Sequence, residues 1–182
     1  SSNSFNTFPH RRVSYAYSDG TTFSVTSNTT NIIRRFDANY VADVAVFVAS
    51  NPQIGYGQKN GVNHIVSEPF NFVVEKVDAN GANIATFGTR DVNGCSSTQF
   101  ESPGMMVQRN SGHILVIDED YSGNGTCTRV VELDSDLNFV RDYDMNQYGM
   151  KYAAAIFKAD NDKFIVIGYN SGSVNIVTVM LE

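Results

Sequence analysis

Tryptophan is absent from this chain of 182 residues, and charged residues make up only 18% of it. No apolar run approaches the ~20 residues that a membrane-spanning helix needs, so we expect no membrane span. Two cysteines are too few for a tetrahedral zinc site, and we expect no metal and no cofactor. The lack of tryptophan also weakens a lectin-type role, because tryptophan offers the best face for stacking.

Positive charge is scarce as well, with 13 Lys and Arg against 19 Asp and Glu and a net charge of -6. This balance argues against nucleic acid or an anionic membrane as a partner. The polar surface must consist largely of Ser, Thr, Asn and Gln, a composition common in secreted proteins. We therefore expect an extracellular or cell-surface protein. The sequence begins at Ser1 without a signal peptide, so we take it as a mature or trimmed form whose location is not read from targeting.

Short apolar runs separated by Gly, Asn, Asp and Ser are what the chain has instead. The clearest example predicts four antiparallel strands, at Met105–Arg109, His113–Asp118, Arg129–Leu133 and Leu137–Tyr143. The run Ile114–Ile117 is too short for a helix and suits a strand covered on both faces.

The same unit recurs along the chain, which predicts a single repeat domain over residues 1–182. Glycine closes the first turn of three units and aspartate opens the second turn, because Gly tolerates positive φ and Asp caps its own backbone. These landmarks are Gly20, Gly61, Gly112, Asp37, Asp78 and Asp134. The repeats span about 12–48, 53–88, 104–145 and 152–182.

The stretch GHILVIDEDYSGNGTCTRVVELDSDLNFVRDYD resembles the NHL-type β-propeller repeat and its relatives. The resemblance implies an all-β, propeller-like fold of four repeated four-stranded antiparallel sheets. It also implies a binding or scaffolding fold with no catalytic residues to transfer, so we expect that the chain is not an enzyme. Four units are at the low end for propellers, and half of an eight-bladed dimer or a flattened stack of sheets are the alternatives.

The last unit lacks a fourth strand, and residues 4–8 at the N-terminus supply a candidate. This strand would close its own ring, or it would enter a neighbour's sheet and so build a filament. The residues expected to pair are Phe5, Thr7 and Phe8 with Val174, Ile176, Thr178 and Met180.

Covalent sites are also indicated. Cys95 and Cys127 lie in turn-rich segments and are predicted to form a disulfide, with two free thiols as the alternative. Sequons at Asn28 and Asn124 fall in the same loop of their repeats and predict N-glycosylation.

No catalytic constellation stands out. His64 and His113 occupy equivalent strand starts, and a repeat explains that more simply than a metal site. We therefore predict a non-enzymatic structural or adhesive module that associates with itself. A lectin-like protein that binds carbohydrate or a small ligand, with Tyr121, Tyr148 or Tyr169 stacking on sugar, is the alternative. A glycan hydrolase with paired carboxylates is the second alternative.

Overall fold

The structure is a computed structural model, and the residues that it describes are 13–18, 23–27, 32–36, 42–47, 56–68, 72–89, 99–119, 127–170 and 176–182. Side chains are described from residue 61 onward within these ranges, except at residue 68. Among these residues no helix is long and apolar enough to cross a membrane.

The described residues form four antiparallel sheets that follow one another along the chain, each a meander of consecutive strands. The first sheet contains β1 (Val13–Ser18), β2 (Phe23–Ser27), β3 (Ile32–Phe36) and β4 (Ala42–Phe47). The second contains β5 (Tyr56–Asn60), β6 (Asn63–Glu68), β7 (Val73–Val77) and β8 (Asn83–Phe87).

The third and last sheets continue the series. The third contains β9 (Pro103–Gln108), β10 (Ile114–Asp118), β11 (Arg129–Leu133) and β12 (Phe139–Asp144). The last contains β13 (Tyr152–Lys158), β14 (Phe164–Tyr169) and β15 (Ile176–Leu181). Short 3₁₀ turns η1 (Asn146–Tyr148) and η2 (Asp160–Asp162) flank β13.

The prediction of an all-β chain of antiparallel sheets is confirmed, and the described strands lie within a few residues of the expected ranges. The predicted turn chemistry is present in the second and third sheets. Asp78 and Asp134 each accept backbone N–H groups two and four residues ahead, at 2.7 to 2.9 Å. Gly61 and Gly112 have φ of +59° and +90°, the region that glycine tolerates.

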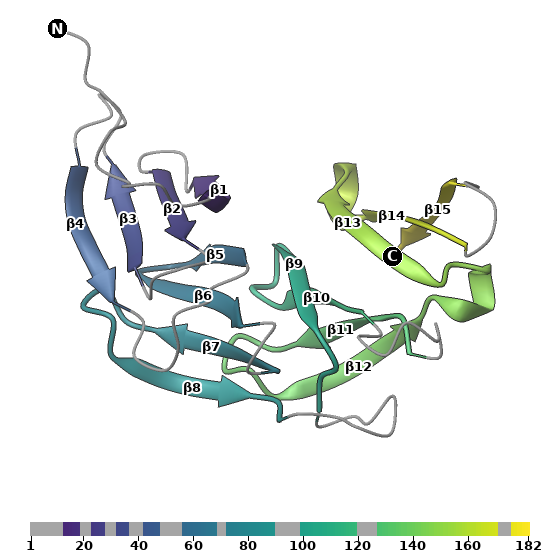
Figure 1. Cartoon of the computed structure of the whole chain (residues 1–182), viewed down its shortest axis with the longest axis horizontal. Coiled ribbons are helices and arrows are strands. Elements are labelled where there is room, and N and C mark those ends of the chain that lie inside the picture. The colour runs from purple at the N-terminus through teal and green to yellow at the C-terminus, as the bar shows by residue number, and fades with distance from the viewer. Residues whose placement is uncertain are drawn as a thin grey trace, which may run out of the picture.

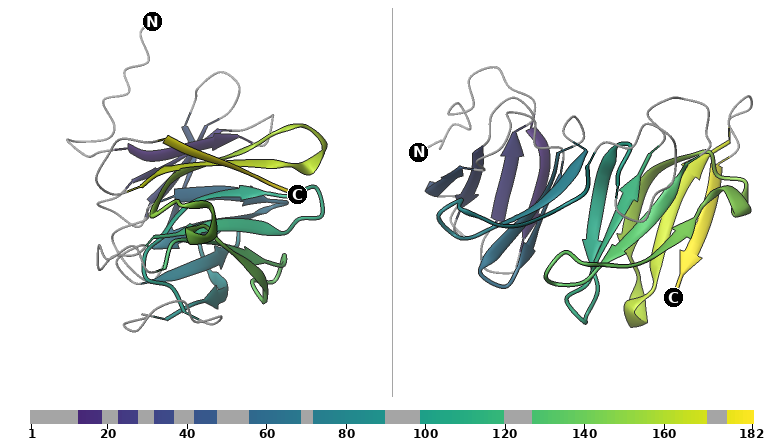
Figure 2. Two further views of the ribbon diagram at one scale, coloured as in Figure 1. Left: turned by 90° about the vertical axis from the view of Figure 1, so that its right-hand side faces the viewer. Right: turned by 90° about the horizontal axis from the view of Figure 1, so that it is seen from below.

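The sheets are arranged as an open arc (Figure 1), with the first strand of each sheet on the inside. Strand β1 contacts β5, β5 contacts β9, and β9 contacts β13, so equivalent strands meet at each seam between neighbouring sheets. Figure 2 shows the sheets following one another from the first to the last. A strand at residues 4–8 that completes the last sheet stays a prediction, because those residues lie outside the described ranges.

Two apolar clusters fill the described seams. One joins the second and third sheets through side chains such as Ile65, Phe100 and Val116. The other joins the third and last sheets through side chains such as Ile117 and Val166. Consecutive residues of β10 therefore enter opposite clusters, and all of β10 is buried, as expected for a strand covered on both faces.

Candidate functional site: the outer face of the last sheet

The last sheet has one face packed on the third sheet and one face turned away from it. Strand register places three cross-strand rows on the second face, because pairing puts partners on the same side of a sheet. We call these nine residues the outer face: Tyr152, Tyr169 and Ile176, then Ala155, Ile167 and Thr178, then Phe157, Ile165 and Met180. None of them is charged, and Thr178 is the only one without an aromatic, aliphatic or thioether side chain.

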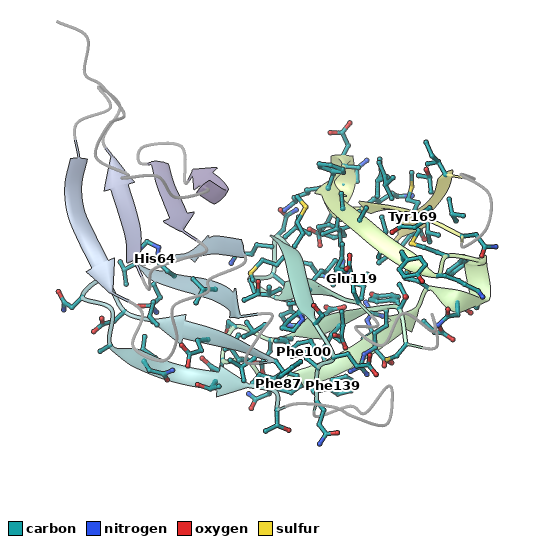
Figure 3. The ribbon with its side chains drawn as sticks, viewed as in Figure 1. His64, Phe87, Phe100, Glu119, Phe139 and Tyr169 are labelled. Atoms are coloured by element: carbon teal, nitrogen blue, oxygen red, sulfur yellow. The ribbon has the colours of Figure 1, made fainter. Side chains whose placement is uncertain are left out.

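Several large side chains of the outer face are open to solvent. Ile176 is 73% exposed, Met180 56%, Phe157 47% and Tyr169 45%. Tyr169, labelled in Figure 3, stacks on Tyr152 with ring centroids 4.8 Å apart. Solvent-exposed sheet faces usually carry polar side chains, so a continuous apolar face of this kind is a candidate interaction site.

The outer face is built like a face that another sheet covers. In both sheets the second strand starts after the first hairpin, pairing Ile114 with Gln108 and Phe164 with Lys158. Ile165 and Ile167 therefore occupy the positions of Leu115 and Ile117, which are buried against the last sheet.

Three of the predicted contact residues lie together on this face. Ile176, Thr178 and Met180 alternate along β15, which is hydrogen-bonded to β14 alone among the described strands. The prediction missed Phe157, Ile165 and Ile167, because only cross-strand register brings β13 and β14 onto the same face, and it named Tyr169 only as a residue that could stack on sugar. Their signal in the sequence was the nearly continuous apolar run in both strands, which is typical of strands covered on both faces.

A second candidate site surrounds Glu132 at the seam between the third and last sheets. The Glu132 carboxylate is 4% exposed and lies 2.9 Å from Nδ1 of His113 and 2.8 Å from Nε of Arg141. Nε of Arg109 is 3.1 Å from the same carboxylate, and the Tyr143 hydroxyl donates a hydrogen bond of 3.1 Å to it. One buried anion is thus surrounded by several donors.

The network holds Glu132 ionised. Burial raises the pKa of its carboxyl, but hydrogen bonds from Arg141 and His113 and the charges of Arg109 and Arg141 outweigh burial and keep the pKa below its usual range. His113 is one-third exposed, with Nδ1 bound to a fixed carboxylate. This arrangement orients an imidazole for ligand binding or for acid–base chemistry.

Arg109 also ties the two sheets together. Its guanidinium lies 3.4 Å from a carboxylate oxygen of Asp162 and 4.9 Å from the centre of the Phe164 ring. The backbone N–H of Asn110 donates to the other Asp162 oxygen at 2.8 Å. The turn η2 is therefore a connection between the sheets, because the Asp162 carboxylate accepts hydrogen bonds from residues of the third sheet's first hairpin.

A third cluster lies on the opposite face of the third sheet. The guanidinium of Arg129 is 2% exposed and contacts the carboxylates of Asp118 and Asp142, each at 3.1 Å. Asp118 also accepts the backbone N–H groups of Glu101 and Ser102 at 2.9 Å. Burial nevertheless raises the pKa of Asp118 to about 6. Because Asp118 is fully buried and engaged, this cluster serves the fold better than it fits an exposed carboxylate pair of a hydrolase.

Several predicted sites lie outside the described residues. They are Phe5, Thr7, Phe8, Asn28, Cys95, Asn124, Val174 and Tyr121. Cys127 is buried and disulfide-bonded. Its pairing with Cys95, the other cysteine in the chain, stays a prediction, as do both glycosylation sites. Within the described ranges, no group of three or more His, Cys, Asp or Glu side chains is placed to hold a metal ion.

No family model and no curated protein sequence matches the chain. Solved structures do resemble it. Virginiamycin B lyase from Staphylococcus aureus has a TM-score of 0.61 at 12% identity, over 91% of this chain and 55% of that chain. A protein of unknown function from Bacteroides caccae has a TM-score of 0.64 at 14% identity, over 88% and 59%. The computationally designed Ika4 protein has a TM-score of 0.61 at 9% identity, over 95% and 93%.

These likenesses show a propeller-like, all-β fold and, at such low identity, the fold alone. The chain spans about half the length of the lyase and of the Bacteroides protein. The prediction that the chain is not an enzyme is corrected, because the lyase is an enzyme and has a similar fold. That prediction had treated the fold as one for binding or scaffolding only. Catalytic side chains are placed on the ends and loops of a fold, so the sheet arrangement does not exclude them.

Proposed function

We propose that the protein is a self-associating structural module of the extracellular space or cell surface, with the last sheet as its contact surface. The observation that carries the proposal is the outer face, nine residues without a charge, several of them half exposed or more. Covering such a face contributes about 25 cal/mol per Å² of apolar surface removed from water, which offsets the entropy lost on association.

The edge of β15, which pairs with β14 alone among the described strands, offers a second contact. Phe5, Thr7 and Phe8 supply an N-terminal strand for it, either from the same chain or from a neighbour. The disulfide at Cys127 supports an oxidising location. The turn glycines and aspartates support the finer assignment to four NHL-type repeats.

Light scattering of the intact chain tests the proposal. We expect a mass above the 20.0 kDa of one chain, and a single-chain mass at every concentration would reject self-association. The double substitution Ile176→Lys and Met180→Lys should lower the mass to that of one chain. Val62→Lys is the matched control, because Val62 is also 73% exposed but lies in the turn between β5 and β6, away from the last sheet. Deletion of residues 1–10 asks separately whether the N-terminal strand is needed.

A second candidate function is the binding of a small polar ligand, such as a glycan, beside the Glu132 network. The observation that favours it is the exposed edge of His113 next to Arg141, which is 52% exposed. Calorimetry against a panel of glycans and small acids should show saturable binding that His113→Ala abolishes. A clean negative across the panel would reject this candidate.

A further inference from the structure

The Glu132 network presents two different polar groups to solvent, side by side. The imidazole of His113 is 33% exposed, and its Nδ1 lies 2.9 Å from one oxygen of Glu132. The guanidinium of Arg141 is 52% exposed, and its Nε donates to the other oxygen at 2.8 Å. Because a single buried carboxylate holds both groups, a small ligand can contact them together.

The carboxylate also fixes which hydrogen-bonding role the outer nitrogen of His113 has. Glu132 is held ionised and offers only lone pairs, so the shared proton lies on Nδ1 of the imidazole. In the neutral ring, Nε2 then carries a lone pair and accepts a hydrogen bond. Among the described residues Nε2 has no hydrogen-bond partner. A hydroxyl group of a ligand is suited to donate to it.

The guanidinium of Arg141 favours an anion instead. Its centre lies 4.8 Å from the centre of the Tyr143 ring, which fixes the plane of the guanidinium. Of the two arginines that contact Glu132, Arg109 is only 8% exposed and also contacts Asp162, so Arg141 is the one open to a ligand. A planar guanidinium with parallel N–H groups matches the two oxygens of a carboxylate.

Asp134 determines which end of a ligand carries the negative charge. Burial raises the pKa of Asp134, but hydrogen bonds from Asn138 and Asp136 and the charge of His113 lower it below its usual range. The Asp134 carboxylate is therefore ionised and near the imidazole. A ligand carboxylate at His113 would meet a like charge, whereas a neutral hydroxyl would not.

Resting on the second candidate function, we propose that this edge binds a sugar acid, with its carboxylate on Arg141 and a hydroxyl that donates to Nε2 of His113. A neutral sugar satisfies only the imidazole, and a simple carboxylate such as acetate satisfies only the guanidinium. The charge-assisted bonds are the stronger ones, so the carboxylate contributes most of the affinity. The net charge of -6 repels anions from the rest of the surface.

A proton NMR titration of the intact chain tests this inference at constant pH and sodium concentration. The ring C–H signals of His113 are assigned by their loss in His113→Ala, since the chain has three histidines. D-glucuronate should shift these signals saturably. D-glucose, which has a hydroxymethyl group in place of the carboxylate, should bind about tenfold more weakly or less. Acetate, which lacks the hydroxyls, should also bind more weakly than glucuronate.

Substitutions separate the charge of Arg141 from its shape. Arg141→Gln should weaken glucuronate binding about tenfold or more and leave glucose binding unchanged. Arg141→Lys keeps the charge but loses the paired N–H groups, so its loss should be smaller. Lys151→Gln is the matched control, because Lys151 precedes β13 at the opposite end from Lys158, whose Nζ bonds Asn110 beside the network. Thermal denaturation confirms that each variant is folded.

Each other outcome overturns a defined part. Equal affinity for glucuronate and glucose rejects the acid but keeps the second candidate function. Equal affinity for glucuronate and acetate rejects the hydroxyl at His113. An equal loss in Lys151→Gln and Arg141→Gln shows attraction to general charge and rejects this site. No saturable shift with any of the three compounds rejects the sugar acid, and the wider calorimetric panel then decides whether the second candidate function fails as well.

Discussion

The third and last sheets are both meanders of consecutive strands, but among the described sheets only the third has a neighbour on each side. Ile117 of the third sheet is 1% exposed, whereas Phe157 and Tyr169 on the outer face of the last sheet are 47% and 45% exposed. The difference arises from position in the arc, because Ile165 and Ile167 of β14 match Leu115 and Ile117 of β10 in register and in apolar character. The sequence of a strand thus indicates an apolar face that is suited to burial. Whether that face is buried depends on the neighbouring sheets.

Charge is distributed differently as well. The third sheet has Arg129 buried toward the second sheet and Glu132 buried toward the last sheet, each fully surrounded by partners. In the last sheet, Thr178 and Met180 stand at the positions that Val130 and Glu132 occupy in the third sheet. The outer face of the last sheet therefore has no charge. Burying a surface without charges does not require any ion to be removed from water. The outer face can therefore contact an apolar partner without that free-energy cost.

The largest expected effect is a difference in the free energy of unfolding between alanine variants of two arginines in the third sheet. Arg129→Ala leaves Asp118 buried without its main cation and should lower the free energy of unfolding by about 3 to 5 kcal/mol. Arg141→Ala removes a half-exposed partner of Glu132 and should cost about 1 kcal/mol or less. Urea denaturation of both variants measures the difference, and equal losses would contradict the burial contrast.

The second prediction concerns how the stability of the fold depends on pH through the buried carboxyl of Asp118. Burial raises its pKa from 3.8 in the unfolded chain to about 6 in the folded chain. The folded chain then holds the proton more tightly, so its stability rises as pH falls from about 6 to about 4. Relative to Asp118→Asn, which does not titrate, the wild type should gain about 3 kcal/mol across this window. Parallel stability curves for the two proteins would contradict the raised pKa.

A matched pair of isoleucines tests whether cover or pattern sets stability. Ile117 and Ile167 occupy the same register position, one in a filled seam and one on the outer face. Ile117→Ala should cost about 2 to 5 kcal/mol, since it opens a cavity. Ile167→Ala should cost about 1 kcal/mol in the single chain, which thermal denaturation at low concentration can resolve. A full cavity-sized cost at Ile167 would show that the outer face is covered within one chain.

The smallest expected effect is at Ile176, the most exposed residue of the outer face. Ile176→Thr should change the stability of the single chain by less than about 0.5 kcal/mol, as exposed substitutions usually do. Val62→Thr, in the turn between β5 and β6, should have an equally small effect on the single chain. At high concentration only the Ile176 variant should lose stability relative to wild type, because only that side chain is covered by association. Identical concentration dependence in both variants would remove this support.

Much of the architecture was predictable from the sequence. The strand ranges, the glycine turns at Gly61 and Gly112 and the aspartate turns at Asp78 and Asp134 all follow from local chemistry. Part of the candidate site was predictable too, because Ile176, Thr178 and Met180 alternate along one strand. The Glu132 network was not, since His113, Arg109 and Arg141 come from different strands and meet only through cross-strand register.

The sequence by itself determined where strands and turns lie and which residues share a face of one strand, because backbone sterics and the two-residue period act locally. Only the tertiary structure decided which faces are covered, which charges meet and which apolar face stays open. Those outcomes depend on the registers between strands and on the number of sheets in the arc. Because the loops between strands vary in length, the local apolar pattern does not determine either of them. The clearest example is the contrast between the exposed outer face of the last sheet and β10, which is buried on both faces.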